Sequence, residues 1–195
     1  MLRGANAILE MKKPNENTAP LQQEGIPSPW ICHYAHLIRS GGQVLDLACG
    51  SGRHARWLAA NNWRVDAVDR DATALAGLQQ LSNVSTRVVD FETDLWPYSN
   101  QRFDGIVVSR YLHRPLLPRL IESLHVGGVL IYETFMDGNE RFGRPKNPDF
   151  LLRSNELLEV FFPHLTVIAF QQGEFQEPGP TVMQRICAVS EKRNN

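Results

Sequence analysis

The sequence predicts an α/β fold: a doubly wound, mostly parallel sheet with helices on both faces and an antiparallel pair of strands at its end. Two observations predict it. Five short apolar runs of strand length alternate with helical or turn-rich segments, which is typical of a parallel sheet. Two further runs close the chain, joined by "QQGEFQEPGP" with no helical pattern, so these last strands can pair as a hairpin.

The first expected element is a helix that follows a polar arm. Residues 11–28 are polar and rich in Pro and Asn, so we expect a flexible arm over residues 1–27 and a single domain over residues 28–195. Ser28 stands where an N-cap is needed, and Pro29 suits the first helical position. The segment "SGG" at 40–42 ends this helix.

The apolar runs then follow in order. Five are expected to form the parallel strands: 43–48 (QVLDLA), 64–69 (RVDAVD), 86–91 (TRVVDF), 103–109 (FDGIVVS) and 127–135 (GGVLIYETF). A helix is expected within 114–124, and a long polar loop fills 136–150. Another helix is expected within 151–162, capped by Ser154 with Glu156 near its start. The closing strands are 165–170 and 181–190.

Charge and composition exclude several classes of protein. Lys plus Arg number 20 and Asp plus Glu number 21, which gives a net charge of −1. Nucleic-acid-binding domains usually carry a surplus of basic residues, so this balance argues against broad reliance on phosphate contacts. Cys32, Cys49 and Cys187 form no C-x-x-C pair or disulfide framework, which favours a reducing, cytoplasmic setting. His33 and His36 lack companion ligands, so no metal is expected. No run has signal-peptide or membrane-spanning character.

The segment "DLACGSGRHA" (46–55) predicts a tight glycine turn between a strand and a helix, and three ligands compete for it. A phosphate-binding Walker loop needs Lys-Ser or Lys-Thr after the second glycine, and neither pair is present. A dinucleotide site is matched by Gly50, Gly52 and Ala55, with Asp69 downstream for a ribose. Against a dinucleotide, Asp46 brings a carboxylate toward the pyrophosphate, and the chain lacks the length for a separate substrate domain.

The third ligand is S-adenosyl-L-methionine, because the chain resembles the class I S-adenosylmethionine-dependent methyltransferases. The resemblance rests on ordered motifs: VLDLACGSG (44–52), VDAVDRD (65–71), VVDFE (88–92), FDGIVVSRYLH (103–113) and LHVGGVLIYETF (124–135). It covers roughly residues 40–190 and extends, more loosely, to small bacterial tellurite-resistance-type methyltransferases. It implies a Rossmann-like sheet of seven strands whose C-terminal hairpin distinguishes it from the dinucleotide fold.

The resemblance also implies how the first strand and its turn hold the cofactor. Asp46 would meet the ammonium group of the methionine moiety. Ala48, Gly50 and Gly52 belong to the turn, where backbone N–H groups at the start of a helix suit the carboxylate. These residues could instead form only a structural turn.

Further cofactor contacts are implied at the ends of the next strands. Asp69, followed by Arg70, would hold the two ribose hydroxyls. Asp90 would face the adenine amino group and Phe91 the ring. Ser109 ends the fourth strand beside the cofactor.

Two of these positions have structural alternatives. Asp71 is a better helix cap than Asp69, so Asp69 is assigned to the ligand. Asp90 could be an ordinary turn residue. Cys49 is expected to be a small packing residue, since no base accompanies it.

The residues after the fourth strand are the candidates for the methyl acceptor. Tyr111 and His113 are expected as wall and base, with Ser109 and Arg110 in the same segment, although His113 could simply help to begin the next helix. The segment "SRYLH" lacks the N-P-P-Y or D-P-P-Y of amino-methylating families, which argues against adenine-N6 or glutamine-amide methylation.

The loop within 133–150 is long enough to be a lid or a binding element, although it could be solvated. Its Arg141, Phe142, Arg144 and Lys146 suit an anionic or aromatic acceptor. We expect a methyltransferase with a small-molecule acceptor. The alternatives are an RNA or protein acceptor, a nicotinamide-dependent reductase, and a non-catalytic cofactor-binding protein. The oligomeric state is not indicated.

Overall fold

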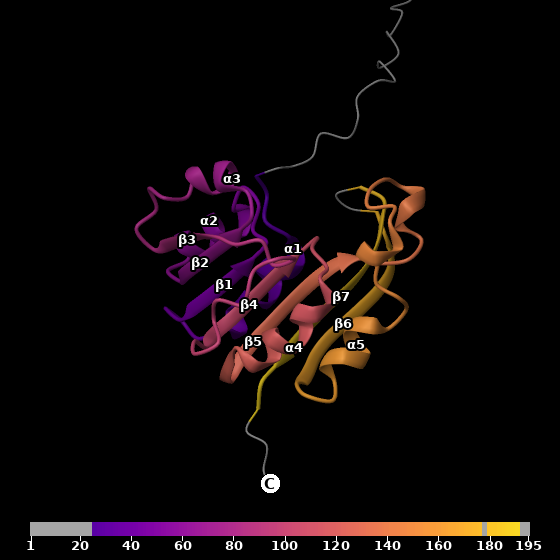
Figure 1. Ribbon diagram of the computed structural model, residues 1–195. Coiled ribbons are helices and arrows are strands. Elements are labelled where there is room, and N and C mark those ends of the chain that lie inside the picture. Colours follow the sequence, from indigo (N-terminus) through magenta and orange to yellow (C-terminus); the bar gives the residue numbers. More distant parts are fainter. Residues whose placement is uncertain (1–24, 177–178, 192–195) are drawn as a thin grey trace, which may run out of the picture.

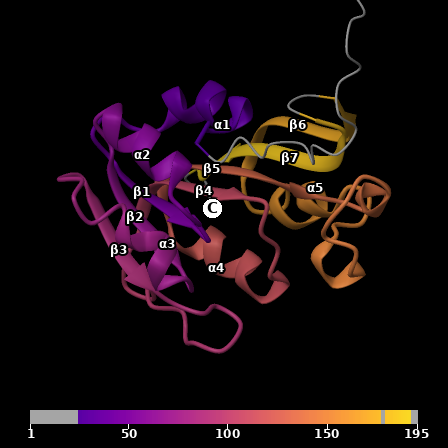
Figure 2. The ribbon, with the colours of Figure 1, turned by 90° about the horizontal axis from the view of Figure 1, so that it is seen from above.

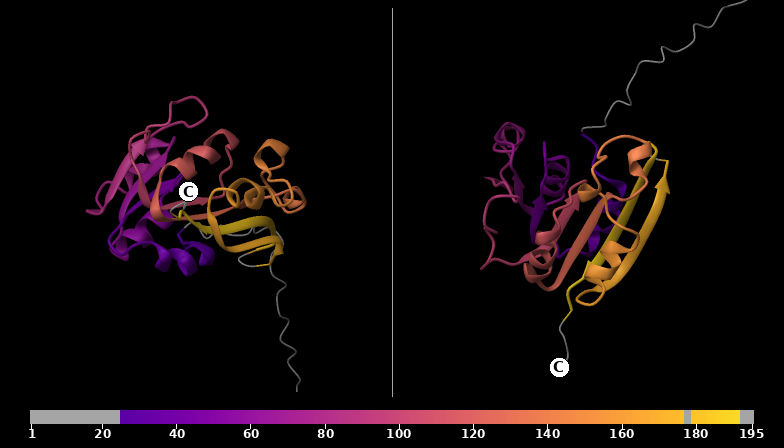
Figure 3. Two further views of the ribbon diagram at one scale, coloured as in Figure 1. Left: turned by 90° about the horizontal axis from the view of Figure 1, so that it is seen from below. Right: turned by 45° about the vertical axis from the view of Figure 1, so that its right-hand side comes forward.

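The computed structural model describes residues 25–176 and 179–191, so most of the expected N-terminal arm lies outside the described residues. Within them the chain forms a seven-stranded sheet in the order β3-β2-β1-β4-β5-β7-β6 (Figure 1). Strands β1 to β5 are parallel to one another, and β7 is antiparallel to both β5 and β6. The predicted fold class is confirmed, including the antiparallel pair at one edge of the sheet (Figure 3).

Strands and helices alternate along most of the chain. The strands are β1 (Gln43–Leu47), β2 (Arg64–Asp69), β3 (Val84–Val88), β4 (Phe103–Ser109), β5 (Leu124–Phe135), β6 (Thr166–Phe175) and β7 (Thr181–Val189). The α-helices are α1 (Pro29–Tyr34), α2 (Arg53–Ala60), α3 (Ala72–Ala76), α4 (Leu117–Glu122) and α5 (Glu156–Phe161). Short 3-10 turns are η1 (Ala35–Leu37), η2 (Arg114–Leu116), η3 (Asn139–Arg141) and η4 (Pro148–Phe150).

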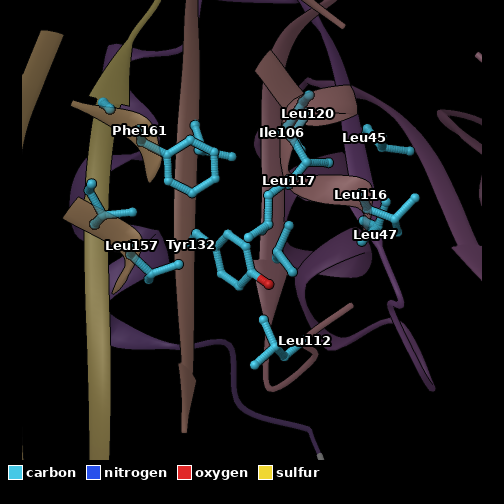
Figure 4. Packing of buried hydrophobic residues seen from close by; sticks show 14 of the residues in the cluster. Leu45, Leu47, Ile106, Leu112, Leu116, Leu117, Leu120, Tyr132, Leu157 and Phe161 are labelled. Carbon is cyan, nitrogen blue, oxygen red and sulfur yellow. The ribbon is translucent and has the colours of Figure 1, made fainter. Parts of the chain in front are cut away.

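Helices cover both faces of the sheet, so the central strands are buried on both sides (Figure 2). Helices α1, α2 and α3 pack on one face through a cluster that includes Trp30, Ile31, Leu58, Leu75 and Val107. Helices α4 and α5 pack on the other face, where the labelled side chains of Figure 4 interdigitate. Each fully buried Leu, Ile or Phe stabilises the fold by about 1.5–3 kcal/mol.

Several boundaries differ from the predicted ones. Strand β3 pairs with β2 only from Val84 to Val88, so Asp90 and Phe91 follow the strand instead of ending it. Strand β5 begins at Leu124, because Leu124 pairs with Phe103 before a register shift near the two glycines. Strand β6 continues to Phe175, beyond the apolar run, because β7 pairs with its polar half.

The predicted caps are confirmed in one case and wrong in another. The Asp71 side chain accepts hydrogen bonds from the N–H groups of Thr73 and Ala74 and caps α3. Ser154 does not cap α5, because Asn155 occupies the N-cap position with a left-handed backbone. Ser28 occupies the N-cap position of α1, but its hydroxyl makes no cap bond.

The Ser28 backbone instead ties the start of α1 to α2. Its N–H donates to Nε2 of His54, 3.1 Å away, and both residues are buried. Burial lowers the pKa of His54 to about 3, so the ring is neutral and can accept this bond. None of the helices within 25–176 and 179–191 is long and apolar enough to cross a membrane.

An ion pair on the other face joins the segment after β4 to the start of α5. Arg114 Nε lies 2.6 Å from Glu156 Oε1, and Arg114 Nη2 lies 3.0 Å from Oε2. The Glu156 side chain is 3% exposed, and its Oε2 also accepts from the Arg153 N–H. Arg114 further donates to the carbonyls of Asp149 and Leu151. One guanidinium thus holds the long loop, α5 and η2 together.

Replacing Arg114 with Met should therefore lower the free energy of unfolding by about 3 kcal/mol, because the buried Glu156 carboxylate loses its main cation. Urea denaturation measures this change. Arg119→Met is the matched control: its pair with Glu122 is 54% and 57% exposed, so its loss should cost less than about 1 kcal/mol. Equal losses in the two variants would contradict the role assigned to Arg114.

Candidate functional site

The turn between β1 and α2 is built from residues with left-handed backbones. Ala48, Gly50 and Gly52 have φ values of 53°, 56° and 77°. The Gly52 N–H donates to the Cys49 carbonyl, and the Cys49 N–H donates to the Val68 carbonyl of β2, each at 3.0 Å. The turn is therefore fastened to itself and to the neighbouring strand.

The two glycines serve different purposes. A Cβ on Gly50 would meet nothing within 4 Å, so Gly50 faces open space that a ligand can use. A Cβ on Gly52 would lie 2.4 Å from Leu78 Cδ1, so Gly52 is needed for packing against the segment after α3. Gly50 is thus the residue whose missing side chain leaves room beside the turn.

Asp46 is the next-to-last residue of β1 and lies in its buried part. It is 1% exposed, and its Oδ2 has no hydrogen-bond partner among the described residues. Burial raises the pKa of Asp46 to about 7, and the charge of Asp69 raises it further, whereas the Ala55 N–H and the Arg53 charge lower it. A buried carboxylate oxygen without a partner is suited to bind a cationic group of a ligand.

Asp69, at the end of β2, is held in place by backbone groups. Its Oδ2 accepts from the Gly50 N–H at 2.7 Å, and its Oδ1 accepts from the Asp71 N–H at 3.0 Å. Each carboxylate oxygen keeps a free lone pair for a ligand hydroxyl. Asp69 therefore fixes the glycine turn and still presents acceptors to the cavity beside it.

That cavity has a volume of about 280 Å³ and lies at the carboxyl ends of the parallel strands. It is lined by six residues predicted for the site, namely Ala48, Asp69, Arg70, Asp90, Phe91 and Tyr111. The remaining lining residues are Val89, Glu92, Arg110, Leu112, Thr134, Phe135, Pro145 and Phe150. Asp46, Gly50, Gly52, Ser109 and His113 are not among the lining residues. Open α/β sheets bind their ligands at this edge.

Asp90 and Phe91 combine a structural role with a place in the cavity. Asp90 Oδ1 accepts from the Glu92 N–H at 3.0 Å, and the Asp90 N–H donates to Asp94 Oδ2 at 2.8 Å. Asp90 therefore also acts as a turn residue, the alternative considered from the sequence. Phe91 is 7% exposed and lies 5.7 Å from Trp96 between ring centroids. Phe91 is thus backed by a second aromatic ring.

Tyr111 and His113 are separated by the structure. Tyr111 lines the cavity, and its backbone carbonyl accepts from the Tyr132 hydroxyl at 2.8 Å. Burial raises the pKa of Tyr111 to about 12, so its phenol is protonated and can donate a hydrogen bond. His113 instead precedes η2, where its carbonyl accepts from the Leu116 N–H. His113 thus helps to begin the helical segment that follows, the alternative role considered from the sequence.

The Ser109 side chain belongs to a hydrogen-bonded series of polar side chains that the sequence did not predict. Its hydroxyl accepts from Arg53 Nη2 at 3.1 Å and donates to Glu133 Oε1 at 3.0 Å. Glu133 Oε2 lies 3.4 Å from Arg185 Nε of β7, and both atoms are buried without a hydrogen bond among the described residues. These residues come from α2, β4, β5 and β7. The only signal in the sequence was that some of them stand near the ends of predicted strands.

The long loop after β5 reaches the cavity through two residues, Pro145 and Phe150. Its base is fastened by the Asn139 side chain, which accepts from the Val182 N–H of β7 at 3.0 Å. The loop residues predicted to suit the acceptor, Arg141, Phe142, Arg144 and Lys146, are not among the residues that line the cavity. Arg141 pairs with Glu174 at 3.4 Å and lies over the Phe142 ring. The loop therefore contributes two apolar residues to the cavity lining.

The remaining candidates behave as packing groups. Cys49 is 8% exposed, and burial raises the pKa of its thiol, which fits the expected packing role. His36 Nδ1 lies 2.7 Å from the His33 carbonyl. Among the described residues, no cluster of three or more His, Cys, Asp or Glu side chains could hold a metal ion.

The sequence of this chain is similar to known methyltransferases. Residues 44–126 match the family model described as a methyltransferase domain. A ribosomal RNA small subunit methyltransferase C of Alcanivorax borkumensis is 29% identical over 106 residues. The match covers 49% of this chain, and the chain spans about a third (33%) of the length of that relative. The predicted resemblance to the methyltransferases is confirmed.

Solved structures share the fold. TehB from Haemophilus influenzae aligns with a TM-score of 0.68 and 22% identity over 83% of this chain and 61% of TehB. The N-methyltransferase NodS from Bradyrhizobium japonicum gives 0.63 and 18% over 83% and 94%. Coclaurine N-methyltransferase, solved with N-methylheliamine and SAH, gives 0.61 and 15% over 81% and 69%.

Substituting Gly52 with Ala should destabilise the protein more than substituting Gly50. Both variants place Ala in a left-handed conformation, which costs about 1–2 kcal/mol. Gly52→Ala also drives a Cβ into Leu78, which should add about 1–3 kcal/mol. Urea denaturation of the two variants measures the difference. In a Leu78→Ala background, Gly52→Ala should lose only the cost of the left-handed conformation, because the contact with Leu78 is gone. If Gly52→Ala costs as much stability in that background as in wild type, the clash is contradicted.

The stability contributed by Asp46 should depend on pH. Because its pKa is about 7 in the folded chain and 3.8 otherwise, stability falls as pH rises from about 4 to 7, by about 4 kcal/mol in total. Asp46→Asn removes this loss. The variant should unfold at a higher temperature than wild type at pH 8, and the difference should shrink toward pH 4. A difference independent of pH would show that Asp46 is not buried as a carboxylate.

Proposed function

We propose that this chain, whose residues 44–126 match the family model of a methyltransferase domain, transfers the methyl group of S-adenosylmethionine to a small-molecule acceptor. The observation that carries the proposal is the buried carboxylate of Asp46 on β1, the strand that leads into the glycine turn, whose Oδ2 has no partner among the described residues. A carboxylate in that place suits the cofactor's ammonium group, whereas a pyrophosphate would be repelled by it. The dinucleotide alternative is therefore disfavoured.

The other residues at this edge of the sheet fit the remaining groups of the cofactor. Backbone N–H groups at the start of α2 suit its carboxylate. Asp69 would accept from the ribose hydroxyls while keeping its bond to Gly50. Asp90 and Phe91 would bind adenine, with Trp96 supporting the Phe91 ring. Ser109 would act indirectly, by holding Arg53.

The cofactor, when bound, supplies a methyl carbon activated by a sulfonium. What the chain must add is alignment of the acceptor and exclusion of water. Phe135, Pro145 and Phe150 provide apolar walls. Tyr111 would orient the acceptor by donating a hydrogen bond, because its raised pKa disfavours a role as base. His113 stays outside the lining residues, so we assign no base.

The acceptor is proposed to be small because the cavity holds about 280 Å³ and the net charge is −1. All seven strands of the described sheet lie within residues 43–189, which supports a single domain over 28–195. RNA is the second candidate, favoured by the match to a ribosomal RNA methyltransferase. Tritium transfer from labelled S-adenosylmethionine to purified small-subunit ribosomal RNA tests it directly.

Calorimetric titration of the full chain should detect binding of S-adenosylmethionine and S-adenosylhomocysteine, and Asp69→Ala should weaken both by about tenfold to a hundredfold. The loss follows from removing the ribose acceptor and its bond to the turn. Asp71→Ala, which removes only the cap of α3, is the control and should retain affinity. Binding of NADH alone would overturn the proposal in favour of a reductase. Cofactor binding without methyl transfer to any acceptor would favour a non-catalytic binding protein.

A further inference from the structure

Arg110 follows β4 directly and has an unusual backbone. Its φ of 56° is left-handed, a conformation that costs a residue with a side chain about 1 kcal/mol or more. Its N–H donates to the Glu133 carbonyl at 2.9 Å, which holds the strained residue against the end of β5. The chain therefore turns sharply at Arg110, at the sheet edge where the cavity opens.

Arg110 is an exposed residue of the cavity lining, and its side chain forms no hydrogen bond or ion pair with any described residue. Burial lowers the pKa of Arg53, and the charge of Arg110 lowers it further. The pKa of His54 is likewise lowered by burial, then by the charges of Arg53 and Arg110. Arg110 is thus a cation held near another cation without a carboxylate of its own.

The charged groups of the cavity lining follow the ends of successive strands. Asp69, Asp90 and Glu92 offer carboxylates at or just after the ends of β2 and β3, where Arg70 also lies. Arg110 and Thr134 lie at the ends of β4 and β5, and both can donate hydrogen bonds. Tyr111, next to Arg110, donates as well because its phenol is protonated. The side toward β5 is therefore rich in donors.

The same side is apolar around these donors. Leu112, Phe135, Pro145 and Phe150 complete the lining, and Phe150 is 44% exposed at the edge of the long loop. An acceptor that fits must combine an apolar body with a group that accepts several hydrogen bonds. A guanidinium recognises carboxylates and phosphates through paired, charge-assisted bonds.

We propose that the methyl acceptor is a small anion, with a carboxylate or phosphate that binds Arg110 and an apolar body covered by Phe135, Pro145 and Phe150. The proposal rests on the proposed function and deepens it, because it names the class of acceptor. A cationic amine is disfavoured, since Arg110 would repel it at short range.

Ligand-observed NMR on the full chain saturated with S-adenosylhomocysteine tests the proposal. The probes share one phenyl body: benzoate and phenyl phosphate are anionic, benzamide is neutral and benzylammonium is cationic. We expect the two anions to bind in preference to the others, and their relative affinities distinguish carboxylate from phosphate. Arg110→Met should weaken the anions by about tenfold to a hundredfold, and Arg110→Lys should restore part of the loss.

The control is Arg102→Met, because Arg102 is an exposed arginine next to the opposite end of β4. It should leave anion binding unchanged. Equal binding of benzamide and benzoate, no binding of either anion at millimolar concentration, or unchanged anion binding by Arg110→Met would overturn the proposal.

Two further outcomes separate this inference from its premise and its rival. If wild type fails to bind S-adenosylhomocysteine, the proposed function itself fails. If Arg110→Met loses S-adenosylhomocysteine affinity, Arg110 belongs to the cofactor site and the acceptor proposal is overturned. Displacement of benzoate by a single-stranded RNA oligonucleotide at far lower concentration would identify the bound anion as nucleic-acid phosphate, which also overturns a small acceptor.

Discussion

The site depends on keeping a carboxylate, Asp46, inside the sheet. Its strand, β1, lies between β2 and β4 and is covered on both faces, so water cannot stabilise the charge. Burying an unpaired charge is costly, and the raised pKa of Asp46 expresses that cost. The nearby compensation is the Ala55 N–H in the first turn of α2 and the positive charge of Arg53. The left-handed glycine turn brings this helix end over the carboxylate.

Arg53 in turn depends on residues far away in the sequence. It bonds Ser109 at the end of β4, Ser109 bonds Glu133 of β5, and Glu133 lies beside Arg185 of β7. Arg185 rests over the Phe175 ring at 3.9 Å. Arg53, one of the charges that act on Asp46, is therefore linked through side chains to the antiparallel end of the sheet.

Much of the fold could be predicted because its signals are local. Apolar runs of strand length and glycine turns gave the order of the strands, and Asp71 was recognisable as a cap from its position before α3. What failed depended on partners. Strand β3 ends early because its only neighbour is β2, and Ser154 loses the cap because Asn155 turns left-handed there.

The site divides in the same way. Asp46 and Gly50 were proposed from the first motif and Asp69 from the second, and of these three only Asp69 is among the cavity-lining residues. The packing role of Gly52 required knowledge that Leu78 lies against it. The Arg53–Glu133–Arg185 chain joins segments separated by tens of residues, and no local pattern reports such contacts. The unpaired state of Arg110 is likewise a property of the folded chain, since in sequence it stands among other candidate residues.

The position of β7 has a consequence for how the chain is made. β7 is the last strand in sequence but lies inside the sheet, between β5 and β6 (Figure 1). During synthesis, the long edge of β5 thus waits unpaired until residues 181–189 have left the ribosome, because β7 pairs with it from Val129 to Phe135. Until then Ile131 and Tyr132 lie beside an open edge that other chains can join. Closure of the sheet therefore requires a pairing between segments far apart in the sequence, which can form only after β7 has been synthesised.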